Sequence, residues 1–450
     1  MKIFSNKKIA ARVDEFLGVI IKQESVVIHQ IAKDQAQQRS FYRLLHNPRL
    51  QTEQVVDYIR NDCGRQVKPG AHYLVFQDTT QPNFERNSRN IVHKQPLGVI
   101  GDRHSLGFFL HPSLVVEAET GRCIGFSDVI TWSRQADAPT IPERSHLKQP
   151  IEEKESYRWI KAAQSSAALL DKAATLTHIC DREADIAELF LRVGSQPGQH
   201  LLVRARADRL LAADRGKLWH LFATMAKAGS YKLLLKGDAR TGRHGREAEL
   251  SLRYSKEKLQ LGKQEMELYV VEAREEQPPR GQQPVCWRIL TTHPVESLEQ
   301  ARQVLVWYSM RWNIEQLFRL LKHKGMNVEA LDLETGKGLV QLTLLALLAV
   351  SKILLLHLCS RQQEPLEVAG AFTEAELECM EAINKQYEGS TLRQKNPYPP
   401  ATLQWCYWVL ARMGGWKPHE KKAGVIFLHR GYMKFSQTFE GWVLARNFVS

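Results

Sequence analysis

The sequence predicts an α/β protein with a helical N-terminal region and an all-β segment inserted before its last core helix. Two observations lead to this fold class. Between residues 71 and 204, short apolar runs that predict strands alternate with amphipathic runs of helical period. In addition, acidic residues directly follow two of the strand-like runs, in the position where α/β sheets build functional sites.

The first part of the predicted sheet follows a helical N-terminal region. Residues 1–66 show apolar residues at helical spacing. Residues 71–78 form a short apolar run that ends in Asp78 and predicts a strand. Residues 106–119 and 123–132 flank a Thr-Gly turn and predict two antiparallel strands.

The next elements alternate helix and strand. Residues 155–172 have the spacing of an amphipathic helix, and residues 176–180 predict a strand that leads into Asp181 and a further helix. Residues 199–204 predict another strand. Asp78 and Asp181 therefore each follow a strand, and the strands that carry them can be neighbours.

A long segment then separates this alternation from the next helix. Period-two patterns in residues 248–254, 267–272 and 285–291 predict that residues 206–298 are an all-β insertion.

Residues 308–322 predict an amphipathic helix. One side carries an acid, two cations and a phenol, which are Tyr308, Arg311, Glu315 and Lys322. At about 100° per residue these four lie within about 60° of one another, with apolar residues opposite. Such a face suits a phosphate backbone held beside a metal-binding carboxylate. It also suits a solvated surface with an Arg311–Glu315 ion pair.

Three carboxylates are the candidate catalytic residues and metal ligands: Asp78, Asp181 and Glu315. Carboxylates held close together repel one another, and a divalent cation removes the conflict. Oxygen ligands suit Mg²⁺ or Mn²⁺, and two such ions about 3.5–4 Å apart catalyse in-line phosphoryl displacement. The local alternatives are an Asx-turn at Asp78 and a helix N-cap at Asp181.

Charge and composition point to a polyanionic partner. The 450 residues carry a formal net charge of +13, and the basic residues are spread along the chain, with a local stretch at 236–246. The seven scattered cysteines include no CxxC pair and fit a reducing cytosol. Residues 339–359 are long enough to span a membrane, but interruptions such as Lys352 favour a buried core helix, so no membrane partner is expected.

Three motifs resemble those of bacterial DDE transposases. They are Phe-Gln-Asp-Thr-Thr at 76–80, Cys-Asp-Arg-Glu-Ala-Asp at 180–185 and the Tyr-x2-Arg-x3-Glu-x6-Lys spacing of 308–322. The last motif is typical of the insertion-sequence-four family, in the branch of the Tn-five-type transposase. Weaker similarity runs nearly end to end.

This resemblance implies a ribonuclease-H-like catalytic core interrupted by the all-β insertion. The core would consist of residues 67–205 and 299–360, with the insertion at 206–298 between them. Residues 1–66 would be a helical DNA-binding region, and residues 361–450 a helical dimerisation region. Within the last region, Leu403–Trp416 is the candidate dimer contact.

The resemblance also implies cut-and-paste transposition. Transposon ends would be cleaved with two Mg²⁺ or Mn²⁺ ions held by Asp78, Asp181 and Glu315, through a hairpin intermediate, and joined to target DNA. The implied partners are the double-stranded DNA of both ends and target, and a second copy of the chain in a DNA-bound homodimer. Such a bacterial enzyme would be cytoplasmic, and associated with the nucleoid when bound to DNA.

Six positions match residues near the DNA in this family. Three of them would hold backbone phosphate at the cut site, namely Tyr308, Arg311 and Lys322, and the others are Trp287, Arg182 and Arg204. Trp287 matches an aromatic that traps a flipped base during hairpin formation. Its alternative interpretation is a core tryptophan of the insertion.

The N-terminus departs from the family pattern. The chain begins almost directly at its basic helical region, whereas the family usually has a longer lead that takes part in end recognition. Two hypotheses therefore remain: an active transposase, or a non-catalytic, N-terminally shortened relative that inhibits a full-length transposase or is a decayed copy. A host nuclease with the same core would leave the spacing of residues 308–322 unexplained.

Overall fold

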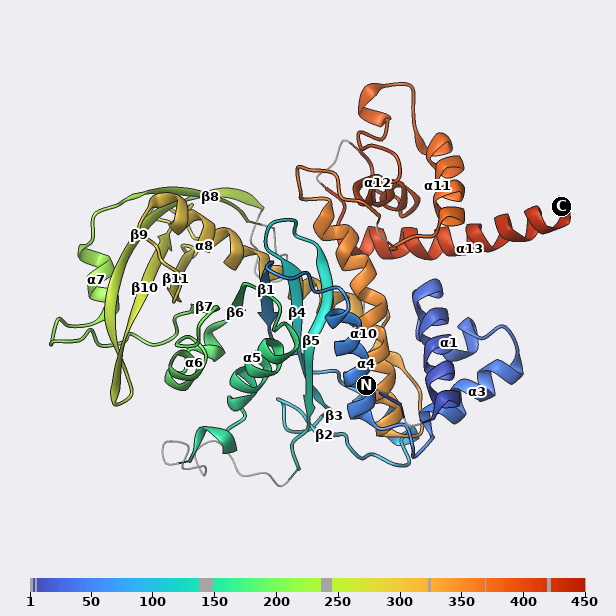
Figure 1. The fold of residues 1–450 in the computed structure, drawn as a ribbon, viewed down its shortest axis with the longest axis horizontal. Coiled ribbons are helices and arrows are strands. Elements are labelled where there is room, and N and C mark those ends of the chain that lie inside the picture. The colour runs from blue at the N-terminus through green and yellow to red at the C-terminus, as the bar shows by residue number, and fades with distance from the viewer. Residues whose placement is uncertain are drawn as a thin grey trace. The chain divides into compact units, whose positions relative to one another are not determined.

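Over the residues that it describes, the structure has a mixed α/β architecture with a large mixed sheet and 13 α-helices (Figure 1). It is a computed structural model that describes residues 3–4, 6–136, 149–235, 245–322, 325–368, 370–418 and 422–449. The chain divides into two compact units, each assembled from separate segments. Unit 1 comprises residues 1–67, 79–140 and 313–450, and unit 2 comprises residues 68–78 and 141–312.

Parallel strands form the centre of unit 2. They are β1 (His72–Gln77), β6 (Thr175–Cys180) and β7 (Gln199–Arg204), and β6 pairs with both of the others. Most of their side chains are buried, as expected for parallel strands covered on both faces. The strands predicted at these positions are confirmed.

Helices cover this sheet through one apolar core. α5 (Tyr157–Leu169) precedes β6, and α6 (Ala187–Arg192) connects β6 to β7. Trp159 of α5 and Phe190 of α6 are both fully buried in the same cluster. α8 (Leu298–Met310) is the last helix of this unit.

Antiparallel strands extend the sheet beyond β7 in the order β11, β10, β9, β8. Their bounds are Cys286–Thr291 for β11, Gln264–Arg274 for β10, Arg246–Leu261 for β9 and Gly229–Leu235 for β8. The three strands predicted here are present, but an all-β insertion is not confirmed, because α7 (Leu218–Thr224) lies in the segment. α7 has only seven residues, too few to show a helical period.

Unit 1 is mainly helical. Its N-terminal helices confirm the helical pattern of residues 1–66, and are α1 (Lys7–Gln23), α2 (Ile28–Ile31), α3 (Gln35–Leu45) and α4 (Thr52–Gly64). Helices from the C-terminal half are α9 (Trp312–Leu321), α10 (Gly336–Cys359), α11 (Glu374–Tyr387), α12 (Leu403–Met413) and α13 (Val425–Val449). Its strands are β2 (Gly98–Val99), β3 (Leu106–Gly107), β4 (Phe109–Glu117) and β5 (Cys123–Trp132), with β4 and β5 antiparallel as predicted.

α10 is the central helix of unit 1. It contacts α1, α3, α4, α12 and α13, and Figure 1 shows it beside α4. Among the described helices, only α10 is long and apolar enough to cross a membrane, yet 89% of its apolar window is buried inside the protein. Lys352 on this helix donates a 2.8 Å hydrogen bond to Tyr432 Oη and lies 4.4 Å from the Phe372 ring centroid. These features are those of a buried core helix.

α12 corrects one expectation about dimerisation. Ten of its eleven side chains are buried, including those of Trp405, Tyr407 and Trp408. The apolar residues of 403–413 therefore form the core of unit 1 and do not present a free face to a second chain. The expectation came from the family resemblance, which does not show that other elements of the same chain cover a helix that is apolar on all sides.

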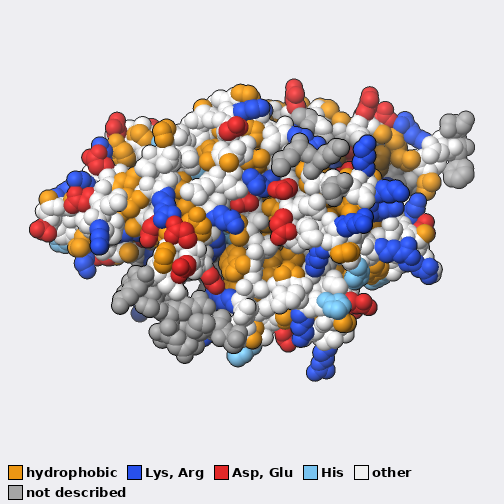
Figure 2. All heavy atoms as spheres, turned by 60° about the horizontal axis from the view of Figure 1, so that its bottom comes forward, with side chains coloured by type: hydrophobic (Ala, Val, Ile, Leu, Met, Phe, Trp, Pro, Cys, Tyr) orange, Lys and Arg blue, Asp and Glu red, His pale blue; other side chains and the backbone are white. Residues whose placement is uncertain are grey.

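Short 3₁₀ helices complete the described structure: η1 (Glu85–Asn90), η3 (Ile151–Glu153), η4 (Arg182–Ala184), η6 (Val328–Ala330) and η7 (Leu392–Gln394). Lys and Arg side chains are interspersed with Asp and Glu on the face drawn in Figure 2. Most of the predicted basic stretch, residues 236–244, lies outside the described residues.

Buried histidines in unit 2 predict a loss of stability in mild acid. Burial lowers the pKa of His178 to about 4, with its ring nitrogens near Gln77 and Gln199. In the unfolded chain this histidine binds a proton below its usual pKa of 6.5, so the free energy of unfolding falls as pH drops from 6.5 towards 4. For His178 alone the loss should reach about 2 kcal/mol at about pH 5.

Urea denaturation of the parent and of His178→Gln at several pH values between about 7 and 5 measures this contribution. The variant should show the smaller pH dependence. His29→Gln, which replaces an exposed histidine, should behave like the parent. Equal pH dependence in all three proteins would contradict the assignment.

Candidate functional site

Asp78 and Asp181 lie at the carboxyl ends of two paired parallel strands. The register of β1 with β6 pairs Phe76 with Ile179. Two residues further along each strand, Asp78 and Asp181 therefore stand at the same level of one sheet edge. This is the edge at which parallel α/β sheets place their functional groups. The structure thus brings together two of the three predicted carboxylates.

The buried thiol of Cys180, the last residue of β6, is influenced by the charges of both aspartates. Burial raises the pKa of Cys180 well above its usual value, and the negative charges of Asp181 and Asp78 raise it further. The positive charge of Arg311 acts in the opposite direction. The two aspartates and the arginine therefore share one electrostatic environment.

Arg311 forms an ion pair with the first carboxylate. Its Nη1 donates to Asp78 Oδ2 over 2.7 Å, and both side chains are largely shielded from solvent. The arginine offsets part of the repulsion between the two aspartates. It could also bind a phosphate, because its planar group forms the same bonds with either anion.

Asp181 also serves the local role that was its alternative interpretation. It is the N-cap of η4, and its Oδ1 accepts the backbone N–H of Glu183 over 2.8 Å. Within the described part of the chain, Oδ2 takes part in no hydrogen bond. A carboxylate has two oxygens, so capping and metal binding are compatible.

The predicted single helix over residues 308–322 is wrong in one respect. The backbone N–H of Arg311 bonds to the carbonyl of Tyr308, three residues back, so α8 tightens and ends. α9 begins at Trp312. Tyr308 and Glu315 therefore belong to different helices, and the prediction that they lie on one face of a single helix does not apply. The apolar face of α9 is buried as expected, and Glu315 lies half-buried on α9.

Tyr308, Trp287 and Arg204 form one cluster in unit 2. The Trp287 ring meets the Tyr308 ring edge-on, with centroids 5.3 Å apart. Arg204 donates a 2.9 Å hydrogen bond to the carbonyl of Cys286 and also hydrogen-bonds Tyr308. Burial raises the pKa of the Tyr308 phenol, whereas the charges of Arg311 and Arg204 lower it.

Trp287 differs from the core tryptophans of this protein. It is half-buried, whereas Trp159 and Trp408 are fully enclosed. Part of this residue is therefore open to solvent, where a ligand could contact it.

Two further arginines of unit 2, Arg182 and Arg158, have charges that act on the residues described above. Burial lowers the pKa of Arg204, and the charge of Arg182 contributes to the lowering. Arg182 itself is exposed on η4. Arg158 was missed in the sequence: it pairs with Glu183, and its electrostatic partners include Asp181. Its position in a predicted amphipathic helix gave no sign of this, because its partner lies 25 residues away.

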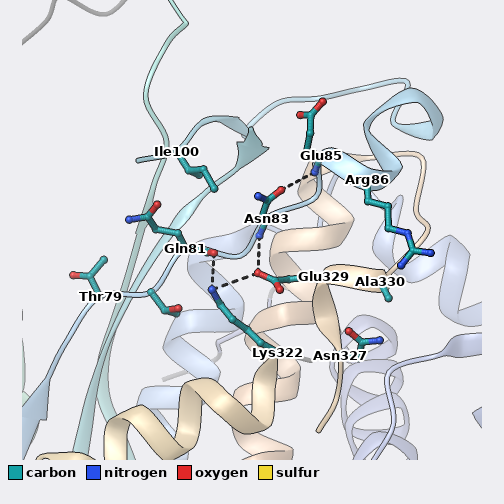
Figure 3. Close-up of a pocket in the computed structure, with 11 residues that line it drawn as sticks. Thr79, Gln81, Asn83, Glu85, Arg86, Ile100, Lys322, Asn327, Glu329 and Ala330 are labelled. Atoms are coloured by element: carbon teal, nitrogen blue, oxygen red, sulfur yellow. Dashed lines mark hydrogen bonds and ion pairs between the residues drawn. The ribbon is translucent and has the colours of Figure 1, made fainter. Parts of the chain in front are cut away.

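Lys322 lies at a polar pocket of unit 1 with a volume of about 780 Å³ (Figure 3). Its Nζ donates to the Gln81 carbonyl over 2.8 Å and lies 3.3 Å from Glu329 Oε1. The pocket begins at Thr79 and Thr80, the residues that follow Asp78. The other lining residues are Gln81, Asn83, Glu85, Arg86, Ile100, Asn327, Glu329 and Ala330.

The donor set fits a hard divalent cation. Among the described residues there is no group of three His, Cys, Asp or Glu side chains placed to hold a metal ion. Mg²⁺, however, usually keeps several waters and binds through one or two carboxylates plus substrate phosphates. The pair Asp78 and Asp181 meets that requirement.

Residues 148–351 match the family model described as the transposase DDE domain. The matched segment is under half of the chain; it contains Asp181, Glu315 and the whole of residues 308–322, while Asp78 lies before it. A domain of this kind implies a ribonuclease-H-like fold, divalent metal ions and DNA as partner. Together with the paired strand ends, the match supports a DDE transposase, a metal-dependent nuclease and strand-transfer enzyme.

Proposed function

We propose that this protein is a cut-and-paste DNA transposase of the insertion-sequence-four family, in the branch of the Tn-five-type transposase. The observation that carries the proposal is the placement of Asp78 and Asp181 at one level of a sheet edge, with Arg311 on Asp78. Glu315 on α9 is the third ligand of the proposed site, which holds two Mg²⁺ or Mn²⁺ ions.

Several residues around this site bind the DNA backbone in the proposed function. Bound ions would supply an activated water or 3′-hydroxyl and stabilise the leaving oxygen. Arg311 exchanges the Asp78 carboxylate for a backbone phosphate as DNA arrives, since both anions accept its forked hydrogen bonds. Tyr308 and Arg204 hold the neighbouring backbone, and Arg182 on the exposed turn adds positive charge.

A hairpin intermediate requires a base to leave the duplex and be held outside it. Trp287 is the proposed holder, supported by its half-buried ring and its edge contact with Tyr308. A flipped base would stack on the exposed part of the ring.

The proposed partners are duplex DNA, supported by the net charge of +13, and a second copy of the chain when DNA is bound. The dimer contact lies in residues 361–450. Since α12 is buried, α13 is the better candidate within them, and its Leu444 is 58% exposed. A cytoplasmic location is part of the proposal, supported by seven free cysteines.

Asp78→Asn, Asp181→Asn and Glu315→Gln should each reduce Mg²⁺-dependent strand cleavage by more than about 10²–10³-fold, because each removes a charge that stabilises the transition state. Cleavage of DNA that carries the element ends, followed on denaturing gels, measures the loss. Folding and duplex binding should remain near parent levels.

Glu381→Gln, on the exposed surface of α11, is the matched control and should cleave normally. Substantial cleavage by any of the three site variants would remove that residue from the site. An inactive parent protein that still binds DNA would instead favour the non-catalytic relative.

Duplex affinity should fall linearly with salt on a log–log plot, with a slope of about −5 to −9 if six to ten phosphates are neutralised. Arg311→Ala and Lys322→Ala should each make the slope shallower by about one. Fluorescence anisotropy across a salt series gives the slopes. A flat response would show that the basic residues are ordinary surface.

Trp287→Ala should leave the first nick largely intact and slow hairpin closure, because stacking contributes about 1–3 kcal/mol to holding a displaced base. Timed gels that separate nicked from hairpin products measure the two steps. Trp159→Ala, in the enclosed core, should lower the melting temperature and both products together, consistent with a loss of about 3–5 kcal/mol. The same behaviour in Trp287→Ala would make Trp287 structural.

A further inference from the structure

The pocket of unit 1 contains polar groups that the proposed reaction does not use. Its inner wall is held together by Glu329, which is 8% exposed. Glu329 Oε1 accepts the backbone N–H of Asn83 over 3.1 Å and also pairs with Lys322. The Glu329 carboxylate therefore connects the segment after α9 to Asn83, in the segment after Asp78. It also forms an ion pair with Lys322.

Two side chains on the outer wall are available to a ligand. Arg86, on η1, is exposed and makes no hydrogen bond or ion pair within the described residues. Asn327 is exposed, has a left-handed backbone (φ 51°), and its side chain does not cap η6. Figure 3 shows both on the same side of Glu329, away from Gln81.

Gln81 contributes a third available group. Its Oε1 accepts the backbone N–H of Gly101 over 2.9 Å, which fixes the side chain and leaves its NH₂ group without a partner among the described residues. Glu85, the other acid of the pocket, is already occupied, because Oε2 accepts the backbone N–H of Leu106 over 2.9 Å. The groups available to a ligand are thus the Arg86 guanidinium and the amides of Gln81 and Asn327. The carboxylates of Glu85 and Glu329 instead accept hydrogen bonds from within the protein.

This combination fits one nucleotide. Arginine and lysine bind phosphate through charge-assisted hydrogen bonds, and Asn or Gln amides pair with base edges. A base enters a concave pocket only when it is unstacked. A volume of about 780 Å³ accommodates such a unit. Trp287 does not line this pocket, so the two features are distinct.

We propose that the pocket binds one unpaired nucleotide of a DNA strand, with its phosphate on Arg86 and Lys322 and its base edge on the amide of Asn327. The proposal rests on the proposed function and extends it to the strand that continues past Asp78, because Thr79 and Thr80 line the pocket. Lys322 leaves Glu329 for the phosphate, while Glu329 retains the Asn83 N–H. The carboxylate is then a positioning residue that competes with the ligand.

Binding of two labelled DNA probes to the full chain, without divalent ions, tests the proposal. One probe is a blunt duplex, and the other is the same duplex with a short single-stranded overhang. The parent protein should prefer the overhang by about tenfold, the effect of one charge-assisted contact. Arg86→Ala and Asn327→Ala should lose most of this preference and keep their affinity for the blunt duplex.

Arg89→Ala is the matched control, because Arg89 is exposed on the same 3₁₀ helix and does not line the pocket. It should retain the parent preference. Glu329→Gln keeps an acceptor for Asn83 but removes the charge, so it should bind the overhang more tightly than the parent and melt at a similar temperature. Glu329→Ala, which loses both roles, should melt lower.

The outcomes distinguish failure of the nucleotide pocket from failure of the proposed function. A parent without preference for the overhang, or equal behaviour of Arg86→Ala and Arg89→Ala, would overturn the nucleotide pocket and leave the proposed function standing. Unchanged overhang affinity in Glu329→Gln would overturn the competing role of Glu329. Failure of the parent to bind either probe would overturn the proposed function and the pocket with it.

Discussion

The parallel pairing of β1 with β6 is the constraint on which the site depends. Side chains alternate between the two faces of a strand, so a slip of one residue would turn one aspartate to the opposite face. Burial of both strands makes such a slip costly, because polar and apolar residues would exchange environments. The positions of Asp78 and Asp181 are therefore properties of the apolar core and do not rely on a flexible loop.

Around this constraint, the charged residues of the molecule are arranged as cation–carboxylate pairs. Arg311 pairs with Asp78, Lys322 with Glu329, and Arg209 with the fully buried Asp185 of the second motif. The Asp185 pair is structural, since its carboxylate also accepts backbone N–H groups. The side chains of the pairs at Asp78 and Glu329 are more exposed than those of the Asp185 pair. Under the proposed function, a DNA phosphate would replace the internal carboxylate as the partner of Arg311 and of Lys322, and the forked geometry of the arginine would favour a phosphate in the correct position.

The sequence predicted the features that have local signals. The apolar runs of β1 and β6, the acids that follow them, and the apolar face of α9 could all be predicted from neighbouring residues. It could not predict partners brought together by folding, such as Arg311 and Asp78, which are 233 residues apart. The end of α8 at Arg311 depends on one tightened hydrogen bond, which leaves no trace in composition. The structural role of Glu329 could not be predicted, because in the sequence a buried acid after a helix is indistinguishable from an exposed one.

The interleaving of the two units has a consequence for synthesis in the cell. β1 must wait for β6, which follows it by roughly 100 residues, a delay of about 5–20 s at ordinary translation rates. Unit 1 takes longer to complete, because its residues 313–450 are synthesised long after its residues 1–67. During that time the apolar residues of β1 and of the first helices are without their final neighbours. Yield in a foreign host should therefore depend on chaperone supply and growth temperature more than on the stability of the finished fold.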